Sequence, residues 1–297
     1  MNNDIVCAPR FSSKSMPNMN LEFVKMLQRM AKVEREPHFR PKKYVVVDKE
    51  DRRVDQGEVP LVLKNPDNVV VVASPTGKAP PPGVGETRVT QLSKAIMTAN
   101  ALSLSGRRGC SIVVHEGLYI DSFNCFGKDG MAALGWPKDF CLEIVGIEEV
   151  RILNTEKSVG KSAFLAYGGM QLTMKNLLVY DWGKGALATI GCFKASRLAL
   201  TDVRVNGNPM QTLLCMEGSE ANVVDCSFSE TPTSFSFHES KGHFQRCRWT
   251  GISGPGHIRR DCLVEFEDSF MSEIGTIIVE GEANFRRCDF VALEQVP

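Results

Sequence analysis

The sequence predicts a mainly β protein that winds as a solenoid of stacked coils, and three observations lead to this fold class. Six segments in the second half of the chain fit one template, apolar-x-x-small or apolar-x-apolar, with middle positions 26, 23, 21, 22 and 19 residues apart. Strand-like alternation repeated at such a period is typical of β-coils that stack on one another. A β-branched run lies ahead of the repeat at residues 69–72, and an amphipathic helix is predicted over residues 88–104.

The template segments are expected to turn their three template positions toward one shared interior. These positions are Met174, Leu177 and Val179; Leu200, Val203 and Val205; Val223, Cys226 and Phe228; Phe244, Cys247 and Trp249; Phe266, Ser269 and Met271; and Phe285, Cys288 and Phe290. A single coil cannot bury its own apolar side, so neighbouring coils must stack and share the core.

Residues 1–68 are predicted to form a partly helical and partly extended N-terminal arm. Apolar residues at helical spacing indicate one amphipathic helix that ends at Pro37; they are Phe23, Val24, Leu27, Met30 and Ala31. Residues 1–43 carry nine basic and four acidic side chains. We interpret this excess first as solvated helix surface, and second as a docking arm for an acidic partner such as nucleic acid or an anionic membrane.

The region between the arm and the template segments is assigned in chain order. Residues 69–72 are four valines, which favour a strand covered on both faces. A proline- and glycine-rich loop follows at residues 79–85. Thr87 is the predicted N-cap of the helix over residues 88–104. Two more strands are predicted before the repeat, over residues 112–119 and 142–146.

This order of elements resembles the pectate-lyase-like superfamily, whose fold is the right-handed parallel β-helix. The resemblance rests on a capping helix, the pattern I-x-V-x-x-G-x-Y at residues 112–119, a strand that ends at Gly146, and the regular coils that follow. It covers roughly residues 69–297 and implies one β-helix domain, with the helix over the open end of its first coil. These motifs belong to the fold, so they carry no catalytic residue over to this chain.

The far end of the predicted solenoid has no second capping helix. The last template segment ends at Phe290 and is followed by Val291 to Pro297. An uncovered solenoid end exposes unpaired strand edges. We therefore expect that this tail, a partner protein or a second copy of the chain covers the C-terminal coil, which includes self-association among the predicted partners.

The chain carries ten cysteines, and none of them is paired at the spacing of a zinc knuckle. Cys226, Cys247 and Cys288 occupy the middle template position and are interpreted as small apolar residues stacked in one core column. His238 and His243 flank a turn but lack a third ligand at convincing spacing. No metal ion and no cofactor are therefore predicted.

Charge and hydropathy restrict the location and the partners that we expect. The chain has 35 basic and 35 acidic side chains, which disfavours a globally basic nucleic-acid binder. No N-terminal signal pattern and no apolar run long enough for a membrane span are present in the sequence. We expect a cytoplasmic, intracellular protein with no transmembrane segment.

The best catalytic candidates lie beside the middle template positions. The residue before each middle position is expected to point outward, and this column contains Asp202 and Asp225 in neighbouring coils. The residue after it gives a second outward column with Arg204 and Arg248. Paired carboxylates beside arginines are the chemistry that an acidic-glycan lyase or hydrolase needs. Alternating charge on a solenoid face has the same appearance, because opposite charges pair across strands.

Aromatic residues provide the candidate binding surface. Tyr180 and Trp182 follow the first template strand, and Phe270 lies in the second outward column. Flat rings can stack on sugars or anchor a protein partner, although such rings more often pack loops onto the body of a fold.

The first functional hypothesis is a non-catalytic binding or scaffold protein that contacts another macromolecule, chiefly a protein, through its coil faces. The first alternative, which the resemblance to the pectate-lyase-like superfamily implies, is a lyase, hydrolase or epimerase that acts on an acidic polysaccharide. The second alternative is a nucleic-acid- or membrane-associated protein, of cellular or viral origin, that uses the basic arm.

Overall fold

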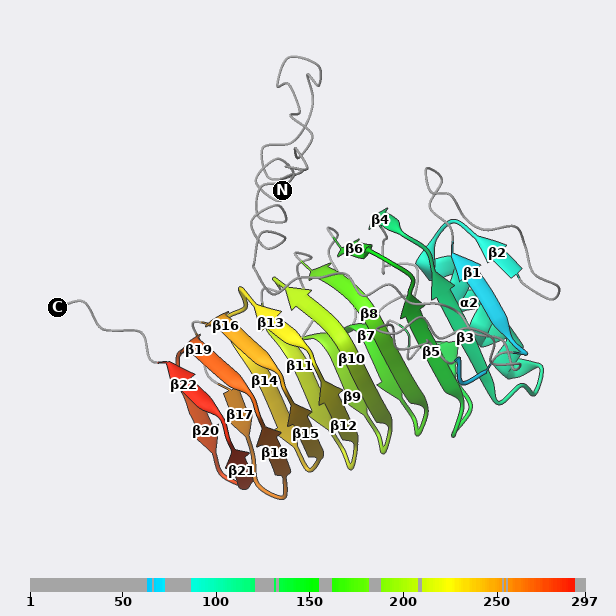
Figure 1. Ribbon diagram of the computed structural model, residues 1–297. Helices are drawn as coiled ribbons and strands as arrows, with labels where there is room; N and C mark the ends of the chain where they lie inside the picture. The colour runs from blue at the N-terminus through cyan, green and yellow to red at the C-terminus, as the bar shows by residue number, and fades with distance from the viewer. Residues whose placement is uncertain are drawn as a thin grey trace, which may run out of the picture. The chain divides into compact units, whose positions relative to one another are not determined.

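The computed structural model describes residues 63–65, 67–72, 87–120, 131, 134–154, 162–181, 188–207, 210–252, 254 and 256–291. The amphipathic helix predicted to end at Pro37 and Trp182 both lie outside these residues, and the proposed domain boundary near residue 68 stays a prediction. The described residues form a parallel β-helix, which confirms the predicted fold class (Figure 1). Among them, no helix is both long enough and apolar enough to cross a membrane.

The coils present three faces, and every strand pairing in the described residues is parallel. The first face contains, in spatial order, β2 (Thr87–Val89), β1 (Val69–Val72), β3 (Gly109–Val114), β5 (Cys141–Gly146), β8 (Gln171–Asp181), β10 (Arg197–Asn206), β12 (Glu220–Val224), β15 (Lys241–Gln245), β18 (Leu263–Glu267) and β21 (Glu282–Arg286).

The second face continues the first, because β8 and β10 are long strands that bend across both. It contains β4 (Gly117–Ile120), β6 (Val150–Asn154), the C-terminal parts of β8 and β10, β13 (Ser227–Ser229), β16 (Arg248–Ile252), β19 (Phe270–Ile274) and β22 (Asp289–Val291). The third face is a separate sheet of β7 (Ser162–Tyr167), β9 (Ala188–Phe193), β11 (Gln211–Met216), β14 (Thr233–His238), β17 (Gly256–Ile258) and β20 (Ile277–Val279).

The strand register confirms the apolar template position by position. On the first face, Leu200 pairs with Met174 on one side and with Val223 on the other. On the second face, Trp249 pairs with Phe228 and with Met271. All fifteen template side chains of the first five segments are at most 2% exposed. The repeat read from the sequence is therefore the interior of the solenoid.

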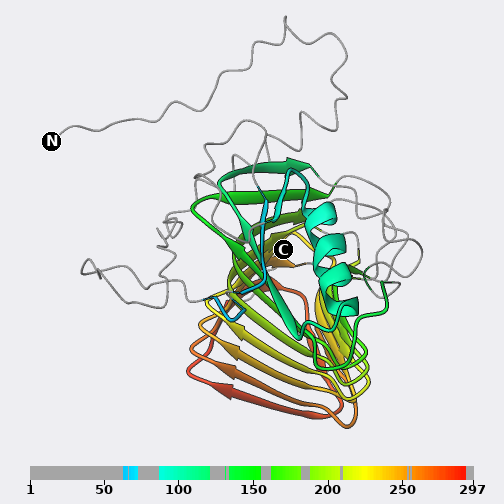
Figure 2. The same cartoon turned by 90° about the vertical axis from the view of Figure 1, so that its right-hand side faces the viewer.

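Helix α2 (Leu92–Leu104) covers the N-terminal end of the coils, as predicted (Figure 2). Its buried face includes Leu92, Ala95, Ile96 and Ala99, which join the core. Thr87 is not the N-cap, because it lies in strand β2 and Gln91 occupies the N-cap position. The capping role comes from the apolar stripe, which closes the interior against water.

The I-x-V-x-x-G-x-Y motif joins β3 to β4 at the corner of an early coil. Its tyrosine, Tyr119, is buried and donates a hydrogen bond from its hydroxyl to the His115 carbonyl oxygen at 2.6 Å. Gly146 ends β5 at the equivalent corner of the next coil. A β-carbon at Gly146 would lie 2.1 Å from the backbone oxygen of Asn176, so only glycine allows the coils to stack this closely.

A buried carboxylate joins residues 63–65 to the outside of the first face. The Glu143 side chain is 1% exposed and lies 2.7 Å from the Lys175 ammonium. Its other oxygen accepts hydrogen bonds from the Ser111 hydroxyl, at 2.8 Å, and from the Lys64 backbone N–H, at 2.9 Å. A buried charge needs partners of this kind, so Glu143 holds a chain segment against three neighbouring strands.

The C-terminal half of the interior is dominated by stacked aromatic rings. The rings of Phe244 and Phe266 stack at 4.9 Å, and those of Phe266 and Phe285 stack at 4.8 Å. The stack ends in the last described coil, where Phe285 is 38% and Phe290 53% exposed. Between β19 and the last coil lies an apolar cavity of about 380 Å³, lined in part by Met271 and Ile277. The core therefore opens to solvent at this end.

Candidate functional site

The corner between the first and second faces positions most of the predicted site residues. Six successive coils place a residue there with positive φ, between 49° and 56°. These residues are Asn176, Asp202, Asp225, Arg246, Asp268 and Arg287. Asparagine and aspartate adopt this left-handed conformation more readily than other non-glycine residues, because their short side chains bond locally to the backbone. The backbone of the corner is therefore one reason for the aspartates in this column.

Small polar side chains close the corner from the inside. The Cys226 thiol donates to the Val224 carbonyl at 3.2 Å, and the Ser269 hydroxyl donates to that of Glu267 at 2.9 Å. The Cys247 backbone N–H in turn donates to the Ser269 hydroxyl of the next coil at 3.1 Å. The sequence predicts these cysteines as apolar fillers only. They do stack in one core column, and they also satisfy backbone groups that the strand ladder leaves at the bend.

Cys226 and Cys247, the two buried cysteines of the core column, are not reactive thiols. Burial raises the pKa of the Cys247 thiol to about 12, and burial also raises the pKa of Cys226. A thiol is a nucleophile or metal ligand only as the thiolate. These two cysteines therefore remain protonated at neutral pH and have a structural role.

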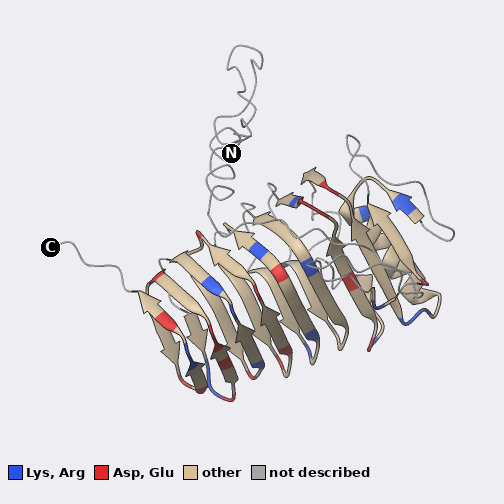
Figure 3. Ribbon diagram, viewed as in Figure 1, with Lys and Arg blue, Asp and Glu red and all other residues tan. Residues whose placement is uncertain are grey.

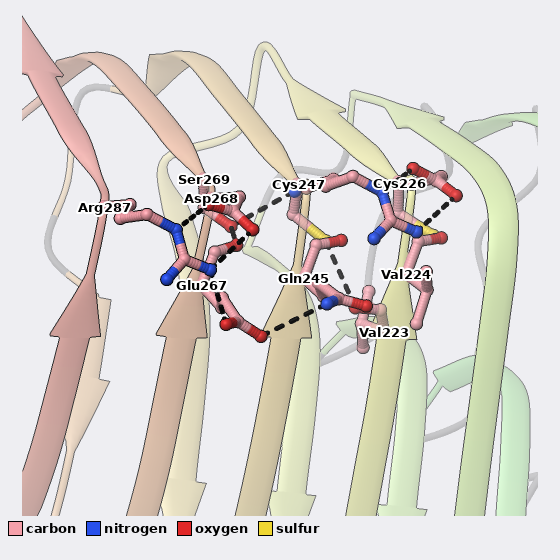
Figure 4. A network of polar contacts seen from close by, with 11 residues as sticks. Val223, Val224, Cys226, Gln245, Cys247, Glu267, Asp268, Ser269 and Arg287 are labelled. Carbon is pink, nitrogen blue, oxygen red and sulfur yellow. Dashed lines mark hydrogen bonds and ion pairs between the residues drawn. The ribbon is translucent and has the colours of Figure 1, made fainter.

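Ion pairs run along the outside of the same corner (Figure 4). Arg246 contacts Asp225 of the preceding coil through two hydrogen bonds, at 2.7 and 3.0 Å. Arg287 contacts Asp268 in the same way, at 2.5 and 3.0 Å, and reaches Glu267 at 2.6 Å. Each arginine thus neutralises the carboxylate of the coil before it, in the bidentate geometry that a guanidinium favours.

A row of arginines lies beside this corner on the outer surface of the second face. Arg151 pairs in register with Leu178, which pairs with Arg204. Arg204 pairs with Ser227, which pairs with Arg248. The three arginines therefore occur at alternate coils of one straight row, and Figure 3 colours those of β10 and β16 blue. We call Arg151, Arg204 and Arg248 the arginine row.

The arginine row includes one aromatic contact. The Arg248 guanidinium lies 4.9 Å from the ring centroid of Phe270, the next residue of the row, in a cation–π arrangement. Both side chains are half-buried. Phe270 thus holds Arg248 in place and offers a partly apolar surface beside it.

The structure brings the four catalytic candidates into two adjacent columns. Asp202 and Asp225 lie at the same corner of neighbouring coils. Burial is the main cause that raises the pKa of the Cys226 thiol, and the charges of both carboxylates add to it as the smallest causes. Arg204 and Arg248 lie in the next column, separated by Ser227. Their placement follows the predicted register. The ion pair between Asp225 and Arg246, however, already engages one of the two carboxylates.

The structure does not expose all of the residues that were predicted to bind a ligand. Tyr180 is 1% exposed, so its ring is not accessible for stacking on a ligand, and this burial argues against its predicted binding role. Leu178, which follows the middle template position Leu177 and so belongs to the second outward column, is also buried. Sequence reasoning missed Arg151, because β6 precedes the first template segment. The alternation of Val150, Arg151 and Ile152 carried the signal for it.

No group of three or more potential metal ligands occurs among the described residues. His238 lies at the end of β14, where burial lowers its pKa. His243 lies on the first face, with its ring 3.4 Å from the Asn222 side chain.

We expect the Arg287→Ala change to raise the pKa of Asp268. The hydrogen bond from Arg287 is the main cause that holds the pKa of this carboxyl below its usual value. Because the folded pKa is lower than the unfolded value of about 3.9, the pair stabilises the fold above that pH. This stabilisation is lost as the pH falls through the lowered folded pKa. A carboxyl-carbon NMR titration measures the shift directly.

Arg246→Ala is the matched control for this titration. Arg246 also lowers the pKa of Asp268, but only as the smallest of its causes, through charge alone. It should therefore raise the pKa of Asp268 by less than Arg287→Ala does. An unchanged Asp268 titration in the Arg287 variant would contradict the ion pair.

Comparison with known proteins gives a likeness at the level of the fold. No protein-family model matches the chain, and no curated protein matches it. A solved structure described as a pectin methylesterase in complex with hexasaccharide VII is similar, with a TM-score of 0.42 and 13% identity. The match covers 78% of this chain and 68% of that one. No residue role is transferred from that enzyme to this chain.

Proposed function

We propose that this protein binds an acidic polysaccharide along its second face without cleaving it. The observation that carries the proposal is the arginine row, in which Arg204 and Arg248 lie at alternate coils and Arg151 already pairs with the Glu149 carboxylate. Coils stack at about 4.8 Å, so successive guanidinium groups recur at roughly 9.6 Å along the solenoid axis. A linear polymer with regularly spaced carboxylates offers charges at repeating distances, and arginine recognises carboxylates with directional hydrogen bonds.

The neighbouring outward row supports a sugar ligand rather than a purely ionic one. Ser229, Thr250 and Ser272 lie in register on β13, β16 and β19. All three are half-buried, so their hydroxyl groups line the surface beside the arginines. Hydroxyl side chains both donate and accept hydrogen bonds, which suits the hydroxyl groups of a glycan. The Phe270 ring adds an apolar patch to the same strip.

The binding role is proposed without catalysis because the aspartates at the corner have structural roles, in the left-handed backbone conformation and in ion pairs. Asp202 and Asp225 occupy left-handed positions that favour aspartate. Asp225 is held by Arg246, and Arg287 lowers the pKa of Asp268. A general acid needs a raised pKa to hold its proton near neutral pH, and an arginine partner has the opposite effect.

Binding of polygalacturonate, measured by isothermal titration calorimetry at low and high salt, tests this function. We expect binding that weakens with salt, and the double variant Arg204→Glu with Arg248→Glu should bind about tenfold or more weakly. The matched control is Arg197→Glu with Lys241→Glu, which makes the same charge change on the exposed first face. Fully methyl-esterified pectin, which lacks the carboxylate charge, should bind weakly to every variant.

The same samples separate the alternatives. If the protein releases unsaturated sugars or reducing ends, and Asp225→Ala abolishes this release, the protein is an enzyme and not only a binding protein. Equal binding of the two double variants would remove the arginine row from the site. Tighter binding of RNA or of anionic vesicles than of polygalacturonate, lost on deletion of residues 1–43, would favour the basic arm instead.

A further inference from the structure

We propose that the C-terminal coil docks against the C-terminal coil of a second copy of this chain, so that the two solenoids join end to end around a two-fold axis. This inference is independent of the polysaccharide site on the second face. It rests on the strand edges, the side-chain sizes and the charges of the last described coil, β20, β21 and β22.

The last coil presents the outer edges of its strands. Within the described residues, β21 pairs with β18 alone, β22 with β19 and β20 with β17. The backbone N–H of Glu282 donates to Cys262 of the preceding coil, and Arg286 accepts from Asp268. Backbone groups alternate along a strand, so those of Ala283 and Phe285 point the other way, toward the open end. Such an edge is a template for another strand.

The aromatic core is also unfinished at this end. Phe285 stacks on Phe266 and meets the ring of Phe290 edge-on in the last coil, and the cavity of about 380 Å³ opens beside these rings. Phe285, Phe290 and Val279 are each more than a third exposed. A contiguous apolar surface of this kind marks an interaction site.

The occupant cannot be the opposite end of another copy, because α2 covers that end (Figure 2). Stacking of a C-terminal coil on an N-terminal coil would require α2 to leave its buried position. A two-fold arrangement joins two identical C-terminal ends and closes without a filament. The flipped copy winds in the opposite sense across the interface, so its strands meet those of the first copy in antiparallel fashion.

The sequence of β21 is complementary to itself in this arrangement. With the axis at Asn284, Ala283 of one copy faces Phe285 of the second copy, and their outward-directed N–H and C=O groups pair. The small alanine leaves room for the exposed phenylalanine ring. Glu282 then faces Arg286 of the second copy on the solvent side, so opposite charges meet on both sides of the axis. A one-residue shift would lose the size match and the charge match together.

Charge reversal and its rescue test the dimer in the full 297-residue chain. Light scattering and sedimentation should give twice the monomer mass of 32.8 kDa. Arg286→Glu places two glutamates opposite each other and should weaken association about tenfold or more. Adding Glu282→Arg exchanges the two charges and should restore the dimer. Lys241→Glu makes the same charge change farther from the end and should leave the mass unchanged.

A cross-link tests the position of the axis. Asn284→Cys should form a reducible intermolecular disulfide on mild oxidation, because facing residues at the axis lie within disulfide distance. Asn222→Cys, in the same outward row on an earlier coil, should not. A monomer at all concentrations, as expected if residues 292–297 cover the end, would overturn the proposal. So would a dimer that neither charge reversal nor the cross-link affects.

Discussion

Cys247→Arg is expected to abolish folding of the solenoid. The Cys247 side chain is 1% exposed, and its sulfur lies 3.3 Å from the Val223 carbonyl and 3.4 Å from that of Gln245. A guanidinium placed there would be buried without a carboxylate partner. The cost of such a charge exceeds about 5 kcal/mol, which is comparable to the whole stability of a typical domain. Far-ultraviolet circular dichroism and soluble yield measure the loss.

Two substitutions are controls for Cys247→Arg. Cys247→Ser keeps the shape of the side chain at a slightly smaller volume and keeps a donor for the Gln245 carbonyl, as Ser269 has for Glu267 in the next coil. It should cost about 1 kcal/mol or less. Arg248→Ala removes the neighbouring outward side chain and its contact with Phe270, at about 0.5–1 kcal/mol. Equal destabilisation by Cys247→Arg and Arg248→Ala would mean that the inward and outward positions are assigned the wrong way round.

Lys175→Met is expected to destabilise the fold by about 2–4 kcal/mol, because it leaves the buried Glu143 carboxylate without its counter-charge. The Lys175 side chain is 23% exposed, so water compensates part of the loss and the lower half of this range is the better estimate. Chemical unfolding in urea measures the free energy, provided that the transition is two-state.

The double variant Lys175→Met with Glu143→Gln identifies the origin of the loss. Removing both charges should restore part of the stability lost in the single variant, since no unpaired charge remains. Glu143→Gln alone completes the cycle, from which the coupling between the two positions is obtained. Additive effects of the two changes would show that the ion pair contributes nothing measurable.

The interior of the solenoid could be predicted from the sequence because one face of every strand is buried. A strand places alternate side chains on opposite faces, so the positions of Leu200, Val223 and Phe244 report both the strand and its register. The end-capping helix was predictable for the same reason, because its apolar stripe has the helical period. Only the start of that helix was misplaced, at Thr87, which belongs to a strand.

The candidate site could be predicted only in part, since a column of aspartates has two physical explanations. The sequence places Asp202 and Asp225 in neighbouring coils but does not report backbone dihedral angles. The left-handed corner explains the aspartates without catalysis, and the paired Arg246 fits that explanation. The contact of Lys64 with Glu143 was likewise not predictable, because residues 79 apart in the sequence share no periodic pattern.

The repeated left-handed corner makes each coil a modular unit. From Cys226 to Cys247 the chain completes one coil and returns to the same backbone geometry in the next coil. Removing or duplicating one such coil would leave the strand pairing among the coils on either side of it intact. Evolution, or a protein engineer, can therefore change the length of the solenoid by whole coils. The length of polysaccharide that the second face is proposed to bind would change in proportion.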